Sequence, residues 1–382
     1  MAVSQLAAKA EQAIGHGDNA VTAQDVTNPG RDRNAYGDTS ETMKALAWMG
    51  KNKVQVVDAP KPKVIEDRDV ILKVTGSTVC GSDLHLLHGS VVELEKGDIL
   101  GHEFCGVVDD VGSAITKWKK GDRVVASFQI ACGDCRYCKK KISSQCERTN
   151  ANTIENYMYG GRTAGMFGYS HFTGGFAGGQ AEYARVPFGD VNLLKLPDDV
   201  PDEKGLYLSD VVSTSWNCVV DTGVKEGDVV AIWGAGPIGQ MAADFAFING
   251  ASRVIVVDNN WRLDWIKERY PKVETLDFTE ANKEKGAKGV QTKLKEMVDG
   301  VGPNVALECV AGEYPKSWTH TIELAAGLET DTSEILNEMI ESVRNYGRVG
   351  ITGVYVGYTN HFNIGKHRSL SSPSLTIPTQ SH

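Results

Sequence analysis

Residues 228–258, DVVAIWGAGPIGQMAADFAFINGASRVIVVD, decide the fold of the second half of the chain. The first apolar run reads as a buried strand, a glycine-rich turn follows, and residues 237–249 then have the apolar period of a helix. Gly250 predicts the end of that helix, and a second strand begins at Arg253. The helix face predicted to be buried carries Met241, Phe245 and Ile248.

Further apolar runs continue this rhythm towards the C-terminus. Strands are predicted at 304–310 and 348–354, with a helical stretch over 333–345 between them. Alternation of strands and helices predicts a parallel, doubly wound sheet. Upstream, short β segments broken by glycine, such as 70–74 and 123–127, predict a β-rich, partly open barrel. The fold class is therefore α/β, in two domains.

The glycine-rich turn has the spacing of a dinucleotide-binding loop. Its first glycine permits a tight turn, the second lets backbone approach a pyrophosphate, and the third brings helix and strand close together. An acid at the end of the second strand, Asp258, can accept both ribose hydroxyls, which favours NAD over NADP. Arg262 lies near enough in sequence to leave NADP open. The predicted cofactor-binding residues of this turn are Gly234, Gly236, Pro237, Ile238 and Gly239.

Length and charge exclude several classes of protein. The chain has 382 residues, 41% of them hydrophobic, and a formal net charge of −9. It can bury a sizeable core, and its acidic balance argues against a nucleic-acid surface. No apolar run reaches the roughly 18–20 residues of a membrane helix. With no secretory or transit pattern at the start, we predict a cytoplasmic protein without nucleic-acid or membrane partners.

Four of the eight cysteines crowd into one short loop, Cys132, Cys135, Cys138 and Cys146. In a reducing compartment such crowding indicates a metal rather than disulfides. Four thiolates at this spacing can close a tetrahedral shell around zinc, so the predicted site is structural. An iron–sulfur cluster is the alternative, but no other feature of the sequence supports electron transfer.

A second group of metal-binding residue types lies at Cys80 and at His102-Glu103. One thiolate, one imidazole and one carboxylate leave room on a zinc ion for water or substrate, which is typical of a catalytic site. Alone, this pattern is weak, because a buried cysteine and a core histidine are common. The thiol loop and the nucleotide turn in the same chain strengthen it.

In this order, the three motifs resemble the zinc-containing medium-chain alcohol dehydrogenases, from about Met43 to Gly365. The resemblance implies a GroES-like catalytic domain followed by a Rossmann NAD-binding domain. It also implies that Cys80 and His102 are catalytic zinc ligands with Glu103 beside them. Members of this family oxidise an alcohol by hydride transfer to NAD and bind one catalytic and one structural zinc.

The resemblance also assigns the residues around the catalytic metal. Ser82 would pass on the substrate proton, His85 would relay it to solvent, and Asp83 would orient His102. At the remaining ligand position the alcohol dehydrogenases have a cysteine, whereas this chain has Asp210. A carboxylate there resembles the glutathione-independent formaldehyde dehydrogenases; the alternative for Asp210 is a helix cap. Thr214 would pack against the nicotinamide.

After Gly365 the resemblance ends, and we predict that the family fold is truncated at the C-terminus. Family members are homo-oligomers that pair sheet strands across the dimer, and this chain is expected to lack those strands and to leave a sheet edge unpaired. The predicted organisation is a disordered arm over 1–42, the GroES-like catalytic domain over 43–213, the Rossmann domain over 214–365 and a non-family tail over 366–382.

Two other functions remain open at this stage. A polyol or threonine dehydrogenase would use the same Cys-His-Glu metal site. Alternatively, truncation would leave an inactive protein that binds zinc and NAD without turnover. The leading prediction is an oxidoreductase acting on formaldehyde hydrate or a small alcohol or aldehyde.

Overall fold

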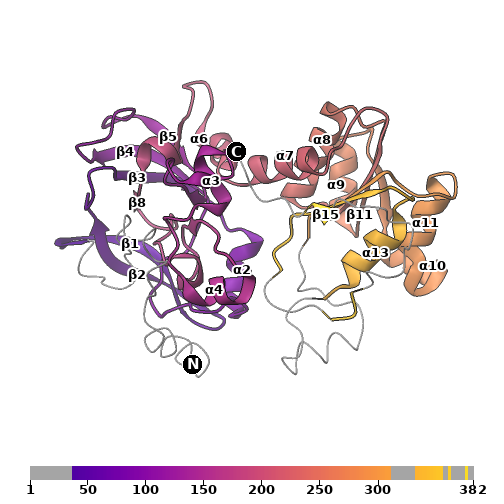
Figure 1. The fold of residues 1–382 in the computed structure, drawn as a ribbon, viewed down its shortest axis with the longest axis horizontal. Coiled ribbons are helices and arrows are strands. Elements are labelled where there is room, and N and C mark those ends of the chain that lie inside the picture. Colours follow the sequence, from indigo (N-terminus) through magenta and orange to yellow (C-terminus); the bar gives the residue numbers. More distant parts are fainter. Residues whose placement is uncertain (1–36, 311–331, 356–359, 363–374, 377–382) are drawn as a thin grey trace. The chain divides into compact units, whose positions relative to one another are not determined.

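The computed structural model of the protein describes residues 37–310, 332–355, 360–362 and 375–376. The backbone divides into two units, the first extending to Asp210 and the second beginning at Val211 (Figure 1). The predicted domain boundary, 213–214, lies slightly downstream of this division. None of the described helices is both long and apolar enough to cross a bilayer.

The first unit is built on antiparallel strands. An N-terminal hairpin pairs β1 with β2, and a larger sheet has the strand order β8-β3-β4-β5-β9. The strands are β1 (Gly37–Gly50), β2 (Lys53–Pro62), β3 (Val70–Ser77), β4 (Phe104–Val111), β5 (Arg123–Ala126), β6 (Gln129–Ile130), β7 (Gly165–Met166), β8 (Tyr183–Val186) and β9 (Leu193–Lys195). The helices are α2 (Gly81–His88), α3 (Arg136–Lys139), α4 (Thr153–Tyr159), α5 (Gly189–Asn192) and α6 (Asp202–Gly205).

The core of the first unit lies against the larger sheet. Leu72 of β3 and Val124 of β5 are fully buried with Phe104 and Phe167, whose rings pack edge to face with centroids 5.1 Å apart. Burying one such side chain stabilises a fold by about 1.5–3 kcal/mol. This apolar cluster also includes Cys132 and Cys146 of the thiol loop, so the loop is attached directly to the core.

The second unit is the predicted parallel sheet, with the order β12-β11-β10-β13-β14-β15. The strand order reverses at β10, and the dinucleotide crevice of this fold lies at such a reversal, beyond the carboxyl ends of the strands. The strands are β10 (Val229–Trp233), β11 (Arg253–Asp258), β12 (Glu274–Asp277), β13 (Val305–Glu308), β14 (Arg348–Ile351) and β15 (Leu375–Thr376). The helices are α7 (Val211–Asp221), α8 (Pro237–Ile248), α9 (Trp261–Arg269), α10 (Phe278–Lys285), α11 (Gly289–Met297) and α13 (Glu334–Ser342). The predicted α/β fold class is confirmed in both parts, the β-rich first domain and the parallel sheet of the second.

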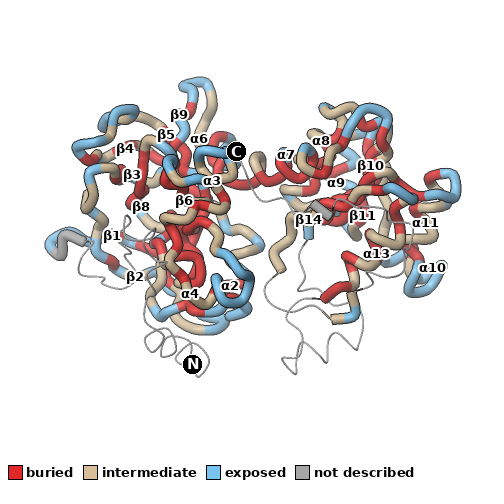
Figure 2. The backbone as a smooth tube through the Cα atoms, viewed as in Figure 1, coloured by how far each residue is buried: buried red, intermediate tan, exposed pale blue. Residues whose placement is uncertain are grey.

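The buried face of α8 differs from the prediction. Met241 and Phe245 are only partly buried, and Ile248 is 64% exposed. Instead the helix buries Gly239, Ala242, Ala243 and Ala246. Small residues are needed because this helix lies very close to the central strands of the sheet. In Figure 2 these strands are buried, whereas α10 is largely exposed. The larger apolar side chains therefore occupy the flanks of the helix.

Two predictions about the chain ends are corrected where the structure describes them. Strand β1 begins at Gly37, opposite Pro62, so residues 37–42 belong to a hairpin rather than to the predicted arm. Within the predicted tail, Leu375 and Thr376 form β15 and pair in parallel with β14, which places a strand on the edge that we expected to be unpaired. Residues 1–36, and the rest of the predicted tail, lie outside the described residues.

Candidate functional site

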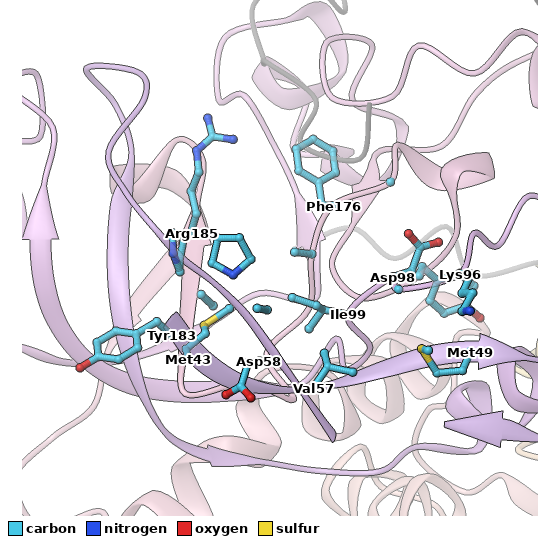
Figure 3. Close-up of a pocket in the computed structure, with 18 residues that line it drawn as sticks. Met43, Met49, Val57, Asp58, Lys96, Asp98, Ile99, Phe176, Tyr183 and Arg185 are labelled. Carbon is cyan, nitrogen blue, oxygen red and sulfur yellow. The ribbon is translucent and has the colours of Figure 1, made fainter. Parts of the chain in front are cut away.

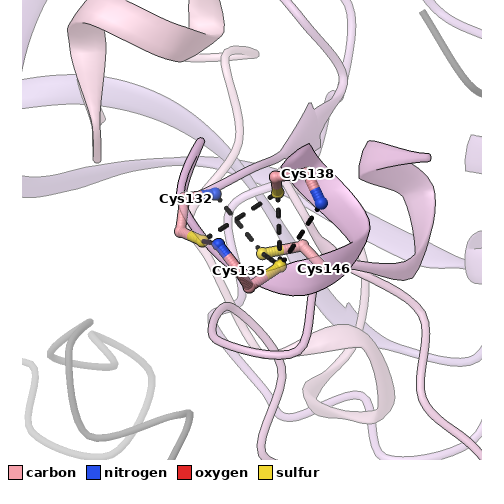
Figure 4. Close-up of side chains that lie close together, drawn as sticks. All are labelled: Cys132, Cys135, Cys138 and Cys146. Carbon is pink, nitrogen blue, oxygen red and sulfur yellow. Dashed lines mark hydrogen bonds between the residues drawn. The ribbon is translucent and has the colours of Figure 1, made fainter. Parts of the chain in front are cut away.

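The four thiols of the cysteine loop meet in one cluster (Figure 4). The Cys135 Sγ–Cys138 Sγ distance is 3.4 Å, Cys132 Sγ–Cys138 Sγ is 3.9 Å, and Cys135 Sγ–Cys146 Sγ is 4.0 Å. A zinc ion with four Zn–S bonds of about 2.3 Å requires sulfur–sulfur edges of about 3.8 Å. The cluster therefore has the size and the donor atoms that a tetrahedral zinc shell needs.

Backbone amides point at these sulfurs. The N–H of Cys132 donates to Cys146 Sγ at 3.3 Å, and the N–H of Cys135 donates to Cys132 Sγ at 3.3 Å. Hydrogen bonds from Cys132 and Cys138 lower the pKa of the Cys146 thiol to about 3, whereas hydrogen bonds to Cys132 and Cys146 raise the pKa of Cys138. The loop thus already favours a thiolate at one of its sulfurs, and a metal binds thiolates.

A second cluster, the mixed cluster, joins Cys80, His102, Glu103 and Asp210, whose ligand atoms all lie within 4.8 Å of one another. His102 Nε2 lies 3.5 Å from Asp210 Oδ2 and 3.9 Å from Glu103 Oε1. Cys80 precedes α2, His102 and Glu103 precede β4, and Asp210 ends the first unit. Three distant segments therefore supply one thiol, one imidazole and two carboxylates.

Electrostatics show that this cluster favours a positive charge at its centre. Burial alone would lower the pKa of His102, but hydrogen bonds with Asp210 and Cys80 outweigh burial and raise that pKa well above its usual value. Burial and the nearby Asp210 charge raise the pKa of Glu103. Two carboxylates and a thiol around a buried imidazole are the arrangement that a bound cation stabilises.

Asp83 lies beside this cluster and contacts the backbone of one of its members. Its Oδ2 accepts the Cys80 N–H at 2.8 Å and the Gln180 side-chain amide at 3.2 Å, and burial raises its pKa. Among the described residues, Asp83 Oδ1 and His102 Nδ1 are both buried without a hydrogen-bond partner. The predicted contact by which Asp83 orients His102 is therefore not formed here, although an acceptor and a donor remain for it.

The two predicted proton-relay residues lie on α2. Ser82 Oγ is 3.9 Å from Cys80 Sγ, and His85 follows one helical turn later and is buried. Residues three apart lie on the same face of a helix, so the two side chains can lie near each other. Two neighbours carried no sequence signal. Gln180 bridges Asp83 and the Thr78 carbonyl, and the Tyr169 and His102 rings pack edge to face with centroids 5.8 Å apart.

A cavity of about 390 Å³ lies in the same unit (Figure 3). Its wall is mostly apolar and includes Met43, Ile99 and Phe176, and Tyr169 also lines it. Its charged lining residues are paired, as Arg185 holds Asp69 at 2.7 Å and Asp98 contacts His171 at 3.3 Å. None of the four residues of the mixed cluster lines it, so this cavity lies beside the candidate metal site rather than on it.

The glycine loop of the second unit has the geometry that its spacing predicts. Gly234 has a φ of +100°, and a Cβ on it would lie 2.7 Å from the Cys309 carbonyl oxygen. A Cβ on Gly239 would lie 1.8 Å from the Gly234 carbonyl oxygen, whereas a Cβ on Gly236 would meet nothing within 4 Å. Gly234 and Gly239 therefore close the turn, and Gly236 leaves open space at the start of α8, where a pyrophosphate can approach. Pro237 and Ile238 form the first turn of that helix.

Around this loop the other predicted cofactor residues are placed as follows. Asp258 ends β11, and its Oδ2 accepts the Ala235 N–H at 2.6 Å, which ties the acid to the glycine turn. Arg262 instead lies over the ring of Trp261, with its guanidinium 5.0 Å from the ring centroid. Thr214 is buried on α7. Ser215, which the sequence did not suggest, donates to the Ile238 carbonyl at 3.1 Å and joins α7 to the start of α8.

Comparison with known proteins gives one consistent result. Residues 66–198 match the family model of the alcohol dehydrogenase GroES-like domain. The chain is 40% identical over 337 residues to a zinc-type alcohol dehydrogenase-like protein of Schizosaccharomyces pombe, covering 87% of this chain and 78% of that protein. It is 32% identical over 327 residues to a glutathione-independent formaldehyde dehydrogenase of Pseudomonas aeruginosa, covering 82% and 75%. Among solved structures, an alcohol dehydrogenase from Thermus sp. ATN1 superposes with a TM-score of 0.68 at 31% identity, covering 85% and 81%.

Proposed function

The chain belongs to the zinc-type medium-chain alcohol dehydrogenase family, and from this we propose that it transfers hydride from formaldehyde hydrate or a small alcohol to NAD. The observation that carries the proposal is the mixed cluster, in which ligand atoms of Cys80, His102, Glu103 and Asp210 lie within 4.8 Å. A closed thiol shell is complete in itself, whereas a mixed site of this kind can leave a position open for substrate.

The residues of this cluster fit a zinc ion. Cys80, His102 and Asp210 would hold it, with Glu103 close enough to join or replace a ligand. A zinc ion held there supplies Lewis acidity towards a substrate hydroxyl, which lowers the pKa of that hydroxyl. The cysteine loop would hold a second, structural zinc, and its attachment to the core of the first unit supports a role in folding.

The chain's own residues would then handle the substrate proton. Ser82 Oγ, close to Cys80, accepts the proton of the substrate hydroxyl as hydride leaves carbon, and His85 passes a proton on towards solvent. The hydrate of formaldehyde suits this chemistry because a gem-diol can lose hydride as an alcohol does. Asp210 in place of the cysteine of alcohol dehydrogenases supports the formaldehyde substrate, and so does the similarity to the Pseudomonas enzyme.

The nucleotide loop supports NAD as the acceptor. The Asp258 carboxylate at the end of β11 would repel a 2′-phosphate, and Arg262, which could bind one, stacks on Trp261 instead. We therefore expect NAD to be used in preference to NADP. Replacing Asp258 with serine removes the repelling charge, so the preference for NAD should fall by about tenfold or more.

A second candidate is a polyol or threonine dehydrogenase, which the presence of Glu103 in the mixed cluster favours. The deciding experiment supplies zinc-loaded protein with NAD and follows NADH formation with formaldehyde, ethanol, sorbitol and threonine. Formaldehyde is tested with and without glutathione. Turnover of formaldehyde without glutathione supports the leading proposal, and preference for sorbitol or threonine supports the second.

Metal and cofactor analysis of the same sample distinguishes an active enzyme from an inactive protein that binds zinc and NAD. Zinc at about two per chain together with NAD binding, but no NADH from any substrate, would overturn the proposal of an enzyme. An Asp210→Ala variant is the control for metal-dependent turnover. It removes one candidate ligand and should lose NADH formation while the thiol cluster keeps its metal.

A further inference from the structure

Glu308, the last residue of β13, has a side chain that is completely buried. Its Oε1 accepts the Val310 N–H at 2.8 Å, and its Oε2 accepts the Gly353 N–H at 2.7 Å. Val310 follows β13 and Gly353 follows β14, so one carboxylate joins the loops at the carboxyl ends of two neighbouring strands. Hydrogen bonds from backbone amides to a carboxylate are about twice as strong as those between neutral groups.

The main chain around Glu308 adds further contacts to the same junction. The Glu308 carbonyl oxygen accepts the Thr352 N–H at 3.1 Å and the Thr352 hydroxyl at 2.6 Å. The next residue, Cys309, donates its N–H to the Trp233 carbonyl at 2.8 Å, at the end of β10. The carboxyl ends of β10, β13 and β14 are therefore joined around Glu308.

This junction lies directly against the glycine turn. A Cβ on Gly234 would lie 2.7 Å from the Cys309 carbonyl oxygen and 2.9 Å from Cγ2 of Val310. Gly234 is therefore in close contact with the two residues that follow Glu308, and their position determines how much room the turn has. A carboxylate that fixes the Val310 amide also fixes this contact.

The strand order of the second unit indicates which half of a dinucleotide these loops face. The order β12-β11-β10-β13-β14-β15 is that of a sheet made of two mononucleotide-binding halves, with the dinucleotide lying across the crevice between them. Asp258 ends β11 in the first half and is the acid expected to bind the ribose of the adenosine. The second half, which begins with β13, is therefore the one that takes the nicotinamide mononucleotide.

We propose that Glu308 is a positioning residue for the nicotinamide half of NAD, and that its carboxylate holds the loops after β13 and β14 in the arrangement that this half requires. The inference rests on the proposed function, in which NAD is the hydride acceptor. Glu308 has no part in the mixed cluster, and both of its carboxylate oxygens accept backbone amides. It therefore acts on the cofactor through the two loops.

The test compares NADH with ADP-ribose, which has the adenosine and both phosphates but no nicotinamide. Dissociation constants for both ligands are measured by calorimetry on wild type and on Glu308→Gln. This change keeps the size of the side chain but places an amide NH2 against one backbone N–H. We expect NADH binding to weaken about tenfold and ADP-ribose binding to change less than about twofold. Equal weakening of both ligands, or no change in either, would overturn the proposal.

Glu338→Gln is the matched control for the loss of a buried carboxylate. Glu338 lies on α13 of the same unit, is 5% exposed and accepts the Trp233 indole N–H at 2.7 Å. Its replacement should leave the binding of both ligands unchanged. The same selective loss of NADH binding in Glu338→Gln and Glu308→Gln would contradict a specific role for Glu308.

Thr352→Val tests the same junction without altering a buried charge. It removes the hydroxyl contact with the Glu308 carbonyl and leaves the carboxylate in place. NADH binding should weaken about threefold while ADP-ribose binding is unchanged, and an unchanged NADH affinity would count against the proposal. A wild type that binds neither ligand would refute the proposed use of NAD and this inference with it. A selective loss in Glu308→Gln, with no turnover by the wild type, would refute only the proposed activity and would support the role of Glu308.

Discussion

The two metal-binding clusters of the first unit are built in opposite ways. The thiol cluster takes four like atoms from residues 132–146, each close enough to hydrogen-bond to a neighbouring amide or thiol. The mixed cluster takes a thiol, an imidazole and two carboxylates from three distant segments, and its arrangement also depends on residues that supply no ligand atom, such as Asp83. A local cluster can stabilise its own loop, whereas a dispersed cluster depends on the fold already being formed.

Because of this difference, substitutions in the thiol cluster and in the mixed cluster should affect different properties of the protein. Loss of a cysteine from the thiol cluster should destabilise the fold, because metal binding at that cluster supplies folding free energy. Loss of a mixed-cluster ligand should damage turnover and leave the fold, because the surrounding sheet supports those residues. Four variants, in order of decreasing effect, test whether the separation holds.

The largest effect is expected for Cys80→Ala. Removing the one thiol of the mixed cluster should reduce NADH formation on the order of a thousandfold, about 4 kcal/mol of transition-state stabilisation. The thermal midpoint should change little, because Cys80 is only partly buried. NADH formation and unfolding are measured on the same sample. A collapse of stability in this variant would break the comparison.

The opposite outcome is expected for Cys146→Ser. This residue is fully buried in the apolar core of the first unit and is a member of the thiol cluster. Losing its sulfur opens the closed shell, so the unfolding free energy should fall by about 3 kcal/mol or more. Urea unfolding with and without a chelator measures this, and the chelator should affect the wild type far more than the variant. Equal chelator sensitivity would show that the loop does not bind a stabilising metal.

A smaller effect is expected for Asp83→Asn. Asp83 touches the mixed cluster through the Cys80 amide but supplies no ligand atom. Its replacement should weaken metal binding at that cluster by about tenfold to a hundredfold. Metal release is followed against increasing chelator, where two separate steps are expected. The step for the thiol cluster should not move, and a shift of both steps would mean that the clusters are coupled.

The smallest effect concerns His171, whose imidazole contacts Asp98 at 3.3 Å. Burial would lower the pKa of His171, but the hydrogen bond with Asp98 raises that pKa above its usual value. A raised histidine pKa contributes stability that is present below about pH 6.5 and is lost as pH rises through the folded-state pKa. His171→Gln should therefore cost up to about 1 kcal/mol near pH 5.5 and less near pH 8.5.

Unfolding of wild type and His171→Gln at the two pH values provides the measurement. A loss of the same size at both would show that packing, not charge, is what the imidazole contributes. The metal contents of both clusters serve as the control, since neither includes His171.

Features formed by neighbouring residues were predicted better from the sequence than features formed by residues far apart in the chain. The glycine turn could be read from spacing alone, because Gly234, Gly236 and Gly239 act within one strand–turn–helix unit. The mixed cluster could not be read this way, because nothing in its spacing brings Asp210 near Cys80, and only the family resemblance suggested it. Tyr169 and Gln180 were missed for the same reason, since their contacts with His102 and Asp83 are made by the fold and not by neighbouring residues.

The error at α8 has a different cause. A stripe of large apolar residues usually marks the buried face of a helix. Here the helix lies so close to the sheet that its buried face can hold only glycine and alanine. Helices that follow a glycine-rich phosphate loop are therefore poorly described by apolar periodicity.

The contact between Gly239 and the Gly234 carbonyl also constrains how the protein can evolve. Every codon one nucleotide away from a glycine codon, apart from synonymous or stop codons, adds a Cβ, and at Gly239 that atom would lie 1.8 Å from the Gly234 oxygen. No single mutational step is open there, whereas Asp258, whose carboxylate bonds to Ala235 of the same loop, can change without such a clash. In a mutagenesis library selected for a new coenzyme, Gly239 should come back unchanged and variation should collect at Asp258.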